Sequence, residues 1–425
     1  MLVFSGTAAA ATWLDVNGII KNHSVEIIGQ GSLDANTSII DPNSGKPIEF
    51  VLIGQDSRDG EENQSVGGNF DDVVGNHQAD TTMVAQISAD RTKINLVSIP
   101  RDSLVDVPQC ETTNGTIPAQ YNVMFNSIFA NAYQTGGDLA SAASCTLNAV
   151  NSLTGLNIQN FIVVDFAGLV KMINAVGGVD LCIPQDVDDP YTSLQLTKGL
   201  HHLDGYQATQ YARTRHGLGD GSDTSRTTRQ QYLIKQLMNE ALSKNLFTDT
   251  AQLYQLAKAA LQSLYISQGM ADTAALAGLA MSLKDFNLSN LYSQTVPVVS
   301  APSDPNRSVW ADEAETLWEK MRMDKPIYGS DESDTNTDAD SANNPGDSTD
   351  NSTEGTGNTG SQEAAPTPDP VTGLITQADG TLIDPNTGGT VDPEDGSIHD
   401  ALTGQYIGLA DRYLNATVCA VPAKN

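Results

Sequence analysis

Six arginines lie within or beside short motifs whose spacing could do chemistry. The chain has ten arginines among 425 residues, and its net charge is −30. Guanidinium groups bind phosphate and carboxylate through paired N–H donors. In such an acidic protein this set predicts a local anion site, although ordinary surface pairing would explain any single member. The six are Arg58, Arg101, Arg213, Arg215, Arg226 and Arg229.

Asp80 and Arg101 are predicted to face each other at the open end of a β-hairpin. The stretches 81–88 and 93–98 are β-rich and are joined by a short polar turn, which is typical of a hairpin. Facing residues on its two strands lie about 5 Å apart. Asp56 follows another short apolar strand and could reach the same end. The alternative is a structural salt bridge at a sheet edge.

Arg213 and Arg215 are expected to project from the same face of a strand, because residues i and i+2 of a strand share a face. Two cations side by side repel each other unless an anion lies between them. Their planar groups would suit a phosphate or a diphosphate. The alternative is that Asp220 and Asp223 neutralise both arginines.

Asp223, Arg226 and Gln230 have the spacing i, i+3, i+7, which places all three on one face of a helix. Asp223 also suits the N-cap of that helix. A helix N-terminus itself attracts phosphate. The pattern therefore predicts a second group of residues that could contact the same anion.

Strands and helices alternate along the part of the chain that carries these residues. This predicts an α/β or α+β layered fold with a mixed sheet. Strands are expected at 50–54, 81–88, 93–98, 161–166 and 291–298. Helices are expected at 137–153, 167–176, from 223 through 237, near 250–265, at 272–284 and at 311–322, and 206–215 is expected to contain a helix and then a strand.

Seven motifs, in their order and wording, resemble the LytR–CpsA–Psr (LCP) family. The resemblance covers roughly residues 48–325. The motifs are Phe50–Arg58, Asp80–Met83, Val97–Ser103, Gly177–Asp180, Leu203–Ala208, Tyr211–Arg215 and Asp223–Gln231.

The resemblance implies a three-layer α-β-α domain with an apolar tunnel for a polyprenyl tail. It also implies transfer of a glycopolymer from a polyprenyl-diphosphate carrier to peptidoglycan, assisted by Mg²⁺ or Mn²⁺. Asp56 and Asp80 would organise the metal ion. Arg101, Asp223 and Arg226 would be catalytic, with Asp223 acting as an acid or orienting the arginines. The implied diphosphate ligands are Arg58, Arg101, Arg213, Arg215, Arg226 and Gln230.

Two positions depart from the family pattern. Gln78 stands where relatives usually carry an arginine, and Met124 stands where they often carry a lysine.

Two other functions remain open. The same site could hydrolyse a lipid diphosphate with water as the acceptor. The protein could also be a regulator that only holds polyprenyl phosphate. Formation of a covalent product with a peptidoglycan acceptor separates these functions.

Charge and cysteine content restrict the partners and the compartment. Phosphate backbones are bound by basic surfaces, so a net charge of −30 disfavours a nucleic-acid partner. The cysteines lack a C-x-x-C pair, and an even number fits disulfides in an oxidising compartment. Cys110 and Cys145 are our first expected pair, out of three possible connectivities for the four cysteines.

The remaining segments are expected to be an anchor, a linker and a tail. Residues 1–14 are apolar but too short to span a bilayer, and are interpreted as the end of a single N-terminal anchor. A juxtamembrane segment at 15–47 would then lead to an extracytoplasmic catalytic domain at 48–326. Residues 327–368 are polar and acidic and predict a disordered linker. Residues 369–425 carry Asp-Pro-x-Thr-Gly turn repeats, and truncation after about 326 is expected to leave an active domain.

Overall fold

A computed structural model describes most of the chain. The anchor expected at 1–14, Arg58, most of the helix expected near 250–265 and most of the linker at 327–368 lie outside the described residues. The described residues are 18–20, 22–30, 40–56, 63, 77–219, 221–243, 258, 261–328, 367–402 and 404–420.

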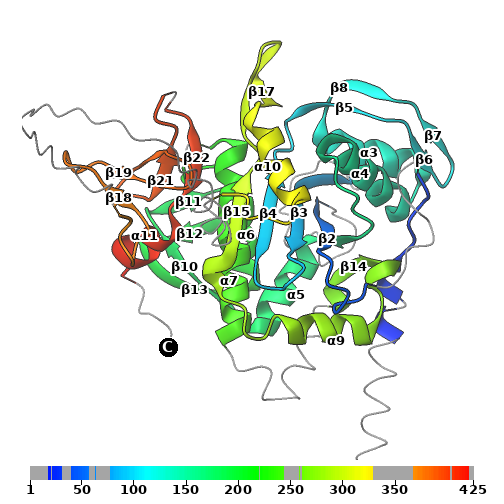
Figure 1. The fold of residues 1–425 in the computed structure, drawn as a ribbon, viewed down its shortest axis with the longest axis horizontal. Helices are drawn as coiled ribbons and strands as arrows, with labels where there is room; N and C mark the ends of the chain where they lie inside the picture. Colours follow the sequence, from blue (N-terminus) through cyan, green and yellow to red (C-terminus); the bar gives the residue numbers. More distant parts are fainter. Residues whose placement is uncertain are drawn as a thin grey trace, which may run out of the picture.

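The described strands of the main domain form a seven-stranded mixed sheet (Figure 1). Its order is β1-β14-β9-β2-β3-β4-β15. The pairs β1–β14, β9–β2 and β4–β15 are parallel, and the other neighbours are antiparallel. The strands are β1 Ser24–Val25, β2 Ile48–Asp56, β3 Gln78–Ile87, β4 Ile94–Ile99, β9 Phe161–Val164, β14 Leu264–Ser267 and β15 Leu291–Thr295. The predicted mixed sheet is confirmed, although neither β1 nor β14 was predicted.

Helices cover both faces of this sheet, because alternate residues of its central strands are apolar on both sides. Val51, Val84 and Val97 pack into one cluster with α3, α4 and α10. Met83 and Leu96 point the other way and pack with α7 and α9. The three-layer α-β-α arrangement is therefore confirmed. The helices are α3 Phe125–Gly136, α4 Leu139–Thr154, α5 Phe166–Val176, α6 Gly205–Arg213, α7 Asp223–Ser243, α9 Thr273–Ser282 and α10 Glu313–Arg322.

Helix boundaries follow local capping chemistry. The Asp165 carboxylate accepts a hydrogen bond from the Gly168 N–H at 2.7 Å and caps the start of α5. Gly177 ends the same helix with a φ of 90°, a conformation that favours glycine. A capping box formed by Asp204 and Gln207 begins α6. The predicted end of α5 at Gly177 is confirmed.

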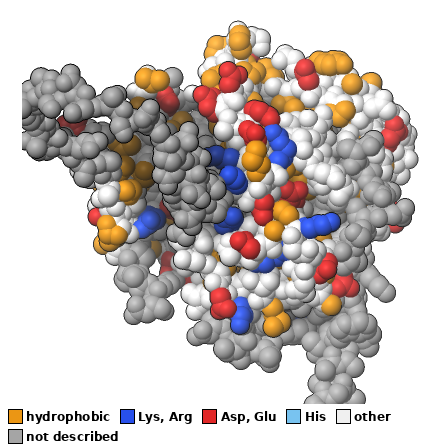
Figure 2. Space-filling view, in the orientation of Figure 1, with side chains coloured by type: hydrophobic (Ala, Val, Ile, Leu, Met, Phe, Trp, Pro, Cys, Tyr) orange, Lys and Arg blue, Asp and Glu red, His pale blue; other side chains and the backbone are white. Residues whose placement is uncertain are grey.

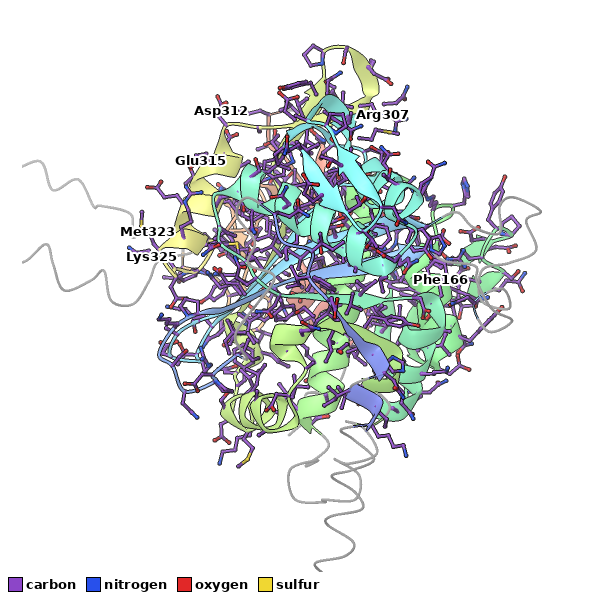
Figure 3. The ribbon with its side chains drawn as sticks, turned by 90° about the vertical axis from the view of Figure 1, so that its right-hand side faces the viewer. Phe166, Arg307, Asp312, Glu315, Met323 and Lys325 are labelled. Carbon is purple, nitrogen blue, oxygen red and sulfur yellow. A yellow bond between two sulfur atoms is a disulfide. The ribbon has the colours of Figure 1, made fainter. Side chains whose placement is uncertain are left out.

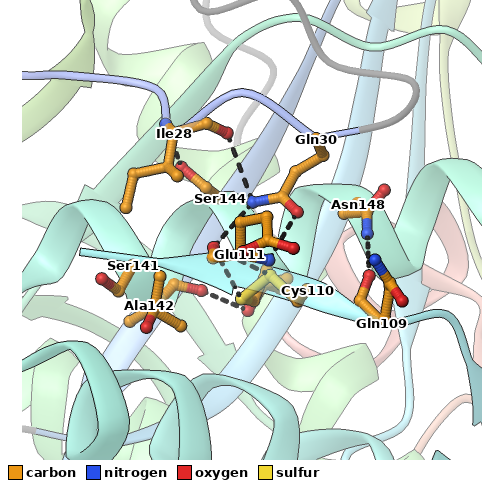
Figure 4. The surroundings of a disulfide bond; sticks show 12 residues. Ile28, Gln30, Gln109, Cys110, Glu111, Ser141, Ala142, Ser144 and Asn148 are labelled. Carbon is orange, nitrogen blue, oxygen red and sulfur yellow. Dashed lines mark hydrogen bonds between the residues drawn. A yellow bond between two sulfur atoms is a disulfide. The ribbon is translucent and has the colours of Figure 1, made fainter. Parts of the chain in front are cut away.

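The expected pairing of Cys110 with Cys145 is confirmed (Figure 4). The bond joins β6 (Cys110–Thr112) to α4. Close to it, the side-chain amide of Gln30 donates to the backbone carbonyl of Glu111 and accepts from its N–H, both at 2.8 Å. The N-terminal segment, β6 and α4 are thereby fastened together.

The repeats near the C-terminus form a second, five-stranded antiparallel sheet rather than a loose tail. At four turns the glycine N–H donates to the carbonyl of the aspartate four residues earlier, at 2.8–2.9 Å. Three are the predicted repeats, and the fourth, Asp392–Gly396, lacks the threonine and was missed. The strands are β18 Ile375–Thr376, β19 Leu382–Ile383, β20 Thr390–Val391, β21 Ser397–His399 and β22 Tyr406–Leu409.

This C-terminal sheet packs beside α7, on the side away from α3 and α4 (Figure 1). A disulfide joins Cys182, in β10 (Val179–Ile183), to Cys419. The Leu414 side chain is 1% exposed and belongs to the same apolar cluster as β10 and α6. The tail is thus attached to the main domain both covalently and by packing.

The described surface shows no element typical of a membrane span. Within the described ranges, no helix combines the length and the apolar composition that crossing a bilayer requires. On the face shown in Figure 2, Lys and Arg side chains lie among Asp and Glu side chains. Large exposed apolar side chains come from separate elements, such as Tyr121 in β8 (Gln120–Met124) and Met281 in α9.

Candidate active site

A pocket of about 480 Å³ lies between the sheet and helices α5, α6 and α7. One part of its wall is apolar and the other part is charged. Leu233 and Leu237 of α7 both line it, so these residues serve the cavity as well as the core. The apolar wall is Leu52, Met83, Ile162, Val164, Phe166, Leu169, Met172, Leu233, Ile234, Leu237 and Leu264. The polar wall includes Asp56, Gln78, Asp80, Arg101, Arg213, Arg215, Arg226 and Gln230.

Two carboxylates and two guanidinium groups form a closed cluster at the charged end. Arg101 Nη1 lies 2.8 Å from Asp80 Oδ1, which confirms the predicted cross-strand pair. Arg226 Nη2 lies 2.5 Å from Asp223 Oδ1, and Arg226 Nη1 lies 3.7 Å from Asp80 Oδ2. Arg101 Nε approaches Asp223 Oδ1 at 3.4 Å. Each arginine therefore contacts both carboxylates.

The electrostatics of the cluster follow from this pairing. Burial alone would raise the pKa of Asp80, but Arg226 and Arg101 lower it below its usual 3.8. Burial would lower the pKa of Arg101, but Asp80 and Asp223 raise it above its usual value. Both groups therefore stay charged at neutral pH, and Asp80 is too weak a base to accept a proton readily.

Arg213 and Arg215 reach the pocket by a route that differs from the prediction. They do not share a strand: Arg213 is the last residue of α6, and Arg215 lies in the irregular segment that follows. The Arg213 guanidinium lies 4.3 Å from the ring centre of Phe166, the first residue of α5 (Figure 3). The expected strand fails because Asp204 and Gln207 cap a helix that runs through Arg213.

Arg215 differs from the other guanidinium groups of the pocket. It is exposed, and it takes part in none of the ion pairs found in the described part of the pocket. Partial burial and the nearby cations Arg226 and Arg101 lower its pKa below the usual value of an arginine. Of the two carboxylates expected to neutralise it in the alternative interpretation, Asp223 forms its ion pairs with Arg101 and Arg226, and Asp220 lies outside the described residues. A bound anion would relieve the repulsion among these cations.

Helix α7 presents Asp223, Arg226 and Gln230 to the site, as their spacing predicts. Gln230 Oε1 accepts a hydrogen bond from Thr81 Oγ1 at 2.9 Å. Asp223 is not the N-cap, because its carboxylate accepts from the Arg101 backbone N–H at 3.1 Å. Ser222 provides the cap instead, through a bond from the Ser225 N–H to Ser222 Oγ at 3.1 Å.

Three carboxylates line the pocket, Asp56, Asp80 and Asp165. Asp165 caps α5, which leaves Asp56 and Asp80 as the pair that could hold a divalent cation. In the register of β2 and β3, Asp56 faces Gln78, two residues from Asp80. Within the described residues no group of three or more His, Cys, Asp or Glu side chains could hold a metal. Mg²⁺ is commonly bound by one or two carboxylates together with substrate phosphates and water, so this donor set fits it.

The two departures from the family pattern have clear structural settings. Gln78 lines the pocket, while the adjacent His77 stacks on Tyr133 with ring centres 3.5 Å apart. Met124 precedes the first residue of α3 as its N-cap. The Asn126 N–H of this helix donates to the Arg101 carbonyl at 3.1 Å, which helps to fix the turn that carries Arg101.

Some contributors to the site could not be selected from the sequence. Asp102 lies 3.6 Å from Arg101 Nε and also binds Arg307 Nη1 at 2.7 Å. Arg307 comes from β17 (Asp304–Trp310), more than 200 residues further along the chain (Figure 3). Asp102 stands within a recognised motif, which was a usable signal. Neither Arg307 nor Phe166 had one.

Comparisons with known proteins agree with this fold. The profile of the LytR_cpsA_psr family matches residues 16–323. Over 300 residues, the chain is 29% identical to cell wall biosynthesis protein LcpA of Corynebacterium glutamicum, covering 67% of this chain and 57% of that protein. It is 27% identical to the polyisoprenyl-teichoic acid–peptidoglycan teichoic acid transferase TagU of Enterococcus faecalis, covering 49% of this chain and 58% of TagU.

A solved structure supports the same fold. Protein gbs0355 of Streptococcus agalactiae superposes with a TM-score of 0.51 at 19% identity, covering 67% of this chain and 89% of that one. The family match spans well over half of the sequence, so the chain belongs to the LytR–CpsA–Psr family. It spans less than two thirds of the length of LcpA and TagU.

Proposed function

We propose that this protein transfers a glycopolymer from a polyprenyl-diphosphate carrier to peptidoglycan. The observation that carries this proposal is the single pocket in which an apolar wall continues into a group of guanidinium side chains. A lipid diphosphate has the matching form, with a hydrocarbon tail joined to two phosphates. The name of the related TagU describes the same type of transfer.

The proposed reaction is a phosphotransfer. An acceptor hydroxyl oxygen forms a bond to the phosphorus that bears the sugar, and the bond from that phosphorus to the bridging oxygen breaks. Polyprenyl monophosphate leaves with the electron pair of that bond, and the hydroxyl proton passes to water as the new bond forms. Negative charge develops on the phosphate oxygens, where Arg101, Arg226, Arg213 and Arg215 would stabilise it. Asp223 would orient Arg101 and Arg226.

Asp56 and Asp80 would hold Mg²⁺ or Mn²⁺ in this site. When bound, such an ion would neutralise charge on the diphosphate oxygens. Asp80 also pairs with Arg101 and Arg226, so its carboxylate would serve both the ion and the arginines.

We further propose that the domain works outside the cytoplasm, attached to the membrane by an N-terminal anchor. All four cysteines are paired, as Cys110–Cys145 and Cys182–Cys419. Disulfides form and persist mainly in oxidising compartments. This supports an extracytoplasmic setting, which is also where peptidoglycan would be met.

A transfer assay tests the function. The full chain is incubated with Mg²⁺ and a polyprenyl-diphosphate-linked oligosaccharide whose sugar is labelled, with and without peptidoglycan fragments. We expect label to become covalently attached to the fragments and polyprenyl monophosphate to be released. Label released at the same rate without an acceptor would indicate a hydrolase instead. Stoichiometric binding without turnover would indicate a lipid-phosphate-binding regulator.

A further inference from the structure

The segment that carries Arg215 has no regular secondary structure of its own. It follows the end of α6 at Arg213 and continues to Leu218, before α7 begins at Asp223. Gly217 has a φ of 78°, which favours glycine and lets the chain turn. An irregular segment can adopt many backbone paths, and fixing each residue costs about 1–2 kcal/mol. Other groups must therefore hold this segment if Arg215 is to point reproducibly at a ligand.

A buried carboxylate holds the N–H groups of the segment. Asp189, at the end of β11 (Val187–Asp189), is 1% exposed. Its Oδ2 accepts from the backbone N–H groups of Arg215 at 3.1 Å and His216 at 3.4 Å, and its Oδ1 accepts from Tyr191 at 2.9 Å. Burial would raise the pKa of Asp189, but these backbone donors lower it below 3.8. The carboxylate is therefore ionised and bound to backbone.

A buried guanidinium holds the carbonyl groups of the same segment. Arg229 of α7 is 5% exposed and does not line the pocket. Its Nη2 donates to the Thr214 carbonyl at 2.5 Å, and its Nη1 donates to the Leu218 carbonyl at 3.2 Å. Nη1 also donates to Ser225 Oγ at 2.7 Å. The Asp189 carboxylate thus accepts from the N–H groups of Arg215 and of the next residue. The Arg229 guanidinium donates to one carbonyl before Arg215 and to one after it.

We propose that Asp189 and Arg229 are positioning residues for the diphosphate ligand Arg215, which is an inference that rests on the proposed function. Arg101 and Arg226 are oriented by carboxylates that contact their side chains. Arg215 has no such ion pair in the described part of the pocket, so its direction depends on the backbone that carries it. The buried carboxylate of Asp189 and the buried guanidinium of Arg229 fix the path of that backbone. Preorganising a binding side chain in this way reduces the entropy lost when the diphosphate binds.

A double-mutant cycle tests the proposal, with geranylgeranyl diphosphate as the probe and geranylgeraniol as its uncharged counterpart. In Asp189→Asn, the amide N–H₂ cannot accept the backbone N–H groups. We expect the Kd for the diphosphate to rise on the order of tenfold, because hydrogen bonds from the backbone to a charged group are lost. In the Arg215→Ala background, the same change should raise the Kd less than about twofold. Binding of geranylgeraniol should be unchanged in all variants.

The controls separate positioning from general loosening of the fold. Asp138→Asn removes a carboxylate that caps α4 by accepting from the Ser141 N–H at 2.8 Å, and should leave diphosphate binding unchanged. Arg229→Lys keeps the charge but loses the fork that reaches both carbonyls, and should repeat the coupling with Arg215. If Asp189→Asn does not fold, the cycle of Arg229→Lys with Arg215→Ala tests the proposal instead.

Two results would overturn the inference in different ways. Equal weakening of diphosphate binding in the presence and absence of Arg215 would show that Asp189 and Arg229 are only structural. If the wild-type protein binds the diphosphate no more tightly than geranylgeraniol, the proposed diphosphate site itself fails, and the positioning role fails with it.

Discussion

The two faces of helix α7 contact different parts of the molecule. At 3.6 residues per turn, residues four and seven positions apart return to the same face. One face lines the pocket of about 480 Å³ through Arg226, Gln230, Leu233 and Leu237. The opposite face packs beside β22, and its residues Thr228, Gln231, Tyr232 and Lys235 line a second pocket, of about 390 Å³, between α7 and the C-terminal sheet.

The two faces also differ in how their polar groups are satisfied. On the tail side, Tyr232 accepts from the Cys182 N–H at 3.1 Å and donates to Asn415 at 2.6 Å, and Lys235 pairs with Asp411. On the pocket side, Gln230 accepts from Thr81 and Arg226 donates to the Asp80 carbonyl, both from the main sheet. Both faces border open space, about 480 Å³ on the pocket side and about 390 Å³ on the tail side. The comparison teaches that the main sheet orients the polar groups on one face of α7, while the tail adds an ion pair and a hydrogen bond on the other.

The largest expected effect is the loss of the tail. A chain that ends at Tyr328 and carries Cys182→Ser lacks the Cys182–Cys419 bond and uncovers the cluster that Leu414 fills. We expect the free energy of unfolding to fall by at least about 3 kcal/mol, which is typical of disulfide removal alone. Urea unfolding followed by circular dichroism measures it. The truncated domain is still expected to be folded and active, and the contacts of the tail indicate that it should be less stable than the full chain.

A full-length Cys182→Ser/Cys419→Ser variant is the matched control, because it removes the covalent bond and keeps the packing. Its stability should lie between those of the wild type and the truncated chain. Equal unfolding midpoints for all three proteins would mean that the tail does not stabilise α7.

On the pocket face, Arg226→Lys should reduce turnover about 10²-fold, as for other charge-stabilising groups. Lysine keeps the charge but cannot contact Asp223 and the Asp80 carbonyl together, which Arg226 does at 2.5 and 3.1 Å. Initial rates of transfer at saturating lipid substrate measure this. Arg322→Lys, which alters a surface pair with Glu315, should be neutral. Wild-type turnover in Arg226→Lys would show that this face of α7 does not take part in catalysis.

Asp80→Asn should have a smaller effect on turnover, about tenfold, and should shift its dependence on Mg²⁺ to higher concentrations. Lipid binding should be partly preserved, because Arg213 and Arg215 remain in the pocket. Activity is measured against Mg²⁺ concentration for both proteins. Mg²⁺ curves that superimpose after scaling would assign Asp80 only to the salt bridges with Arg101 and Arg226.

The sequence predicts the pocket face of α7 far better than its tail face. Asp80 and Arg101 could be paired because a short hairpin fixes its own register, and a helical period places Arg226 and Gln230 together. The expected strand for Arg213 and Arg215 is wrong, because a spacing of two residues fits a strand but also fits other backbone conformations. The capping of α6 and the buried contacts of the segment after it determine which conformation forms.

The contacts of the tail could not be predicted, for a different physical reason. The turn chemistry of the repeats is local, so hairpins could be expected. Their packing on α7 and the pairing of Cys182 with Cys419 join residues 237 apart. No spacing rule connects positions so distant in sequence, and four cysteines allow three connectivities.

The smallest expected effect is that of the Lys235–Asp411 pair on the tail face. Both side chains are 21% exposed, and such pairs contribute roughly 0.2–1 kcal/mol because solvent screens them. Lys235→Ala should lower the free energy of unfolding by that amount and leave turnover unchanged, since Lys235 lies opposite the pocket. Combining it with Asp411→Ala in a double-mutant cycle isolates the pair, and 0.5 M salt should weaken the coupling. A loss of turnover greater than about threefold in Lys235→Ala, without loss of folded protein, would contradict the separation of the two faces. It would mean that the tail side of α7 controls the position of Arg226 and Gln230.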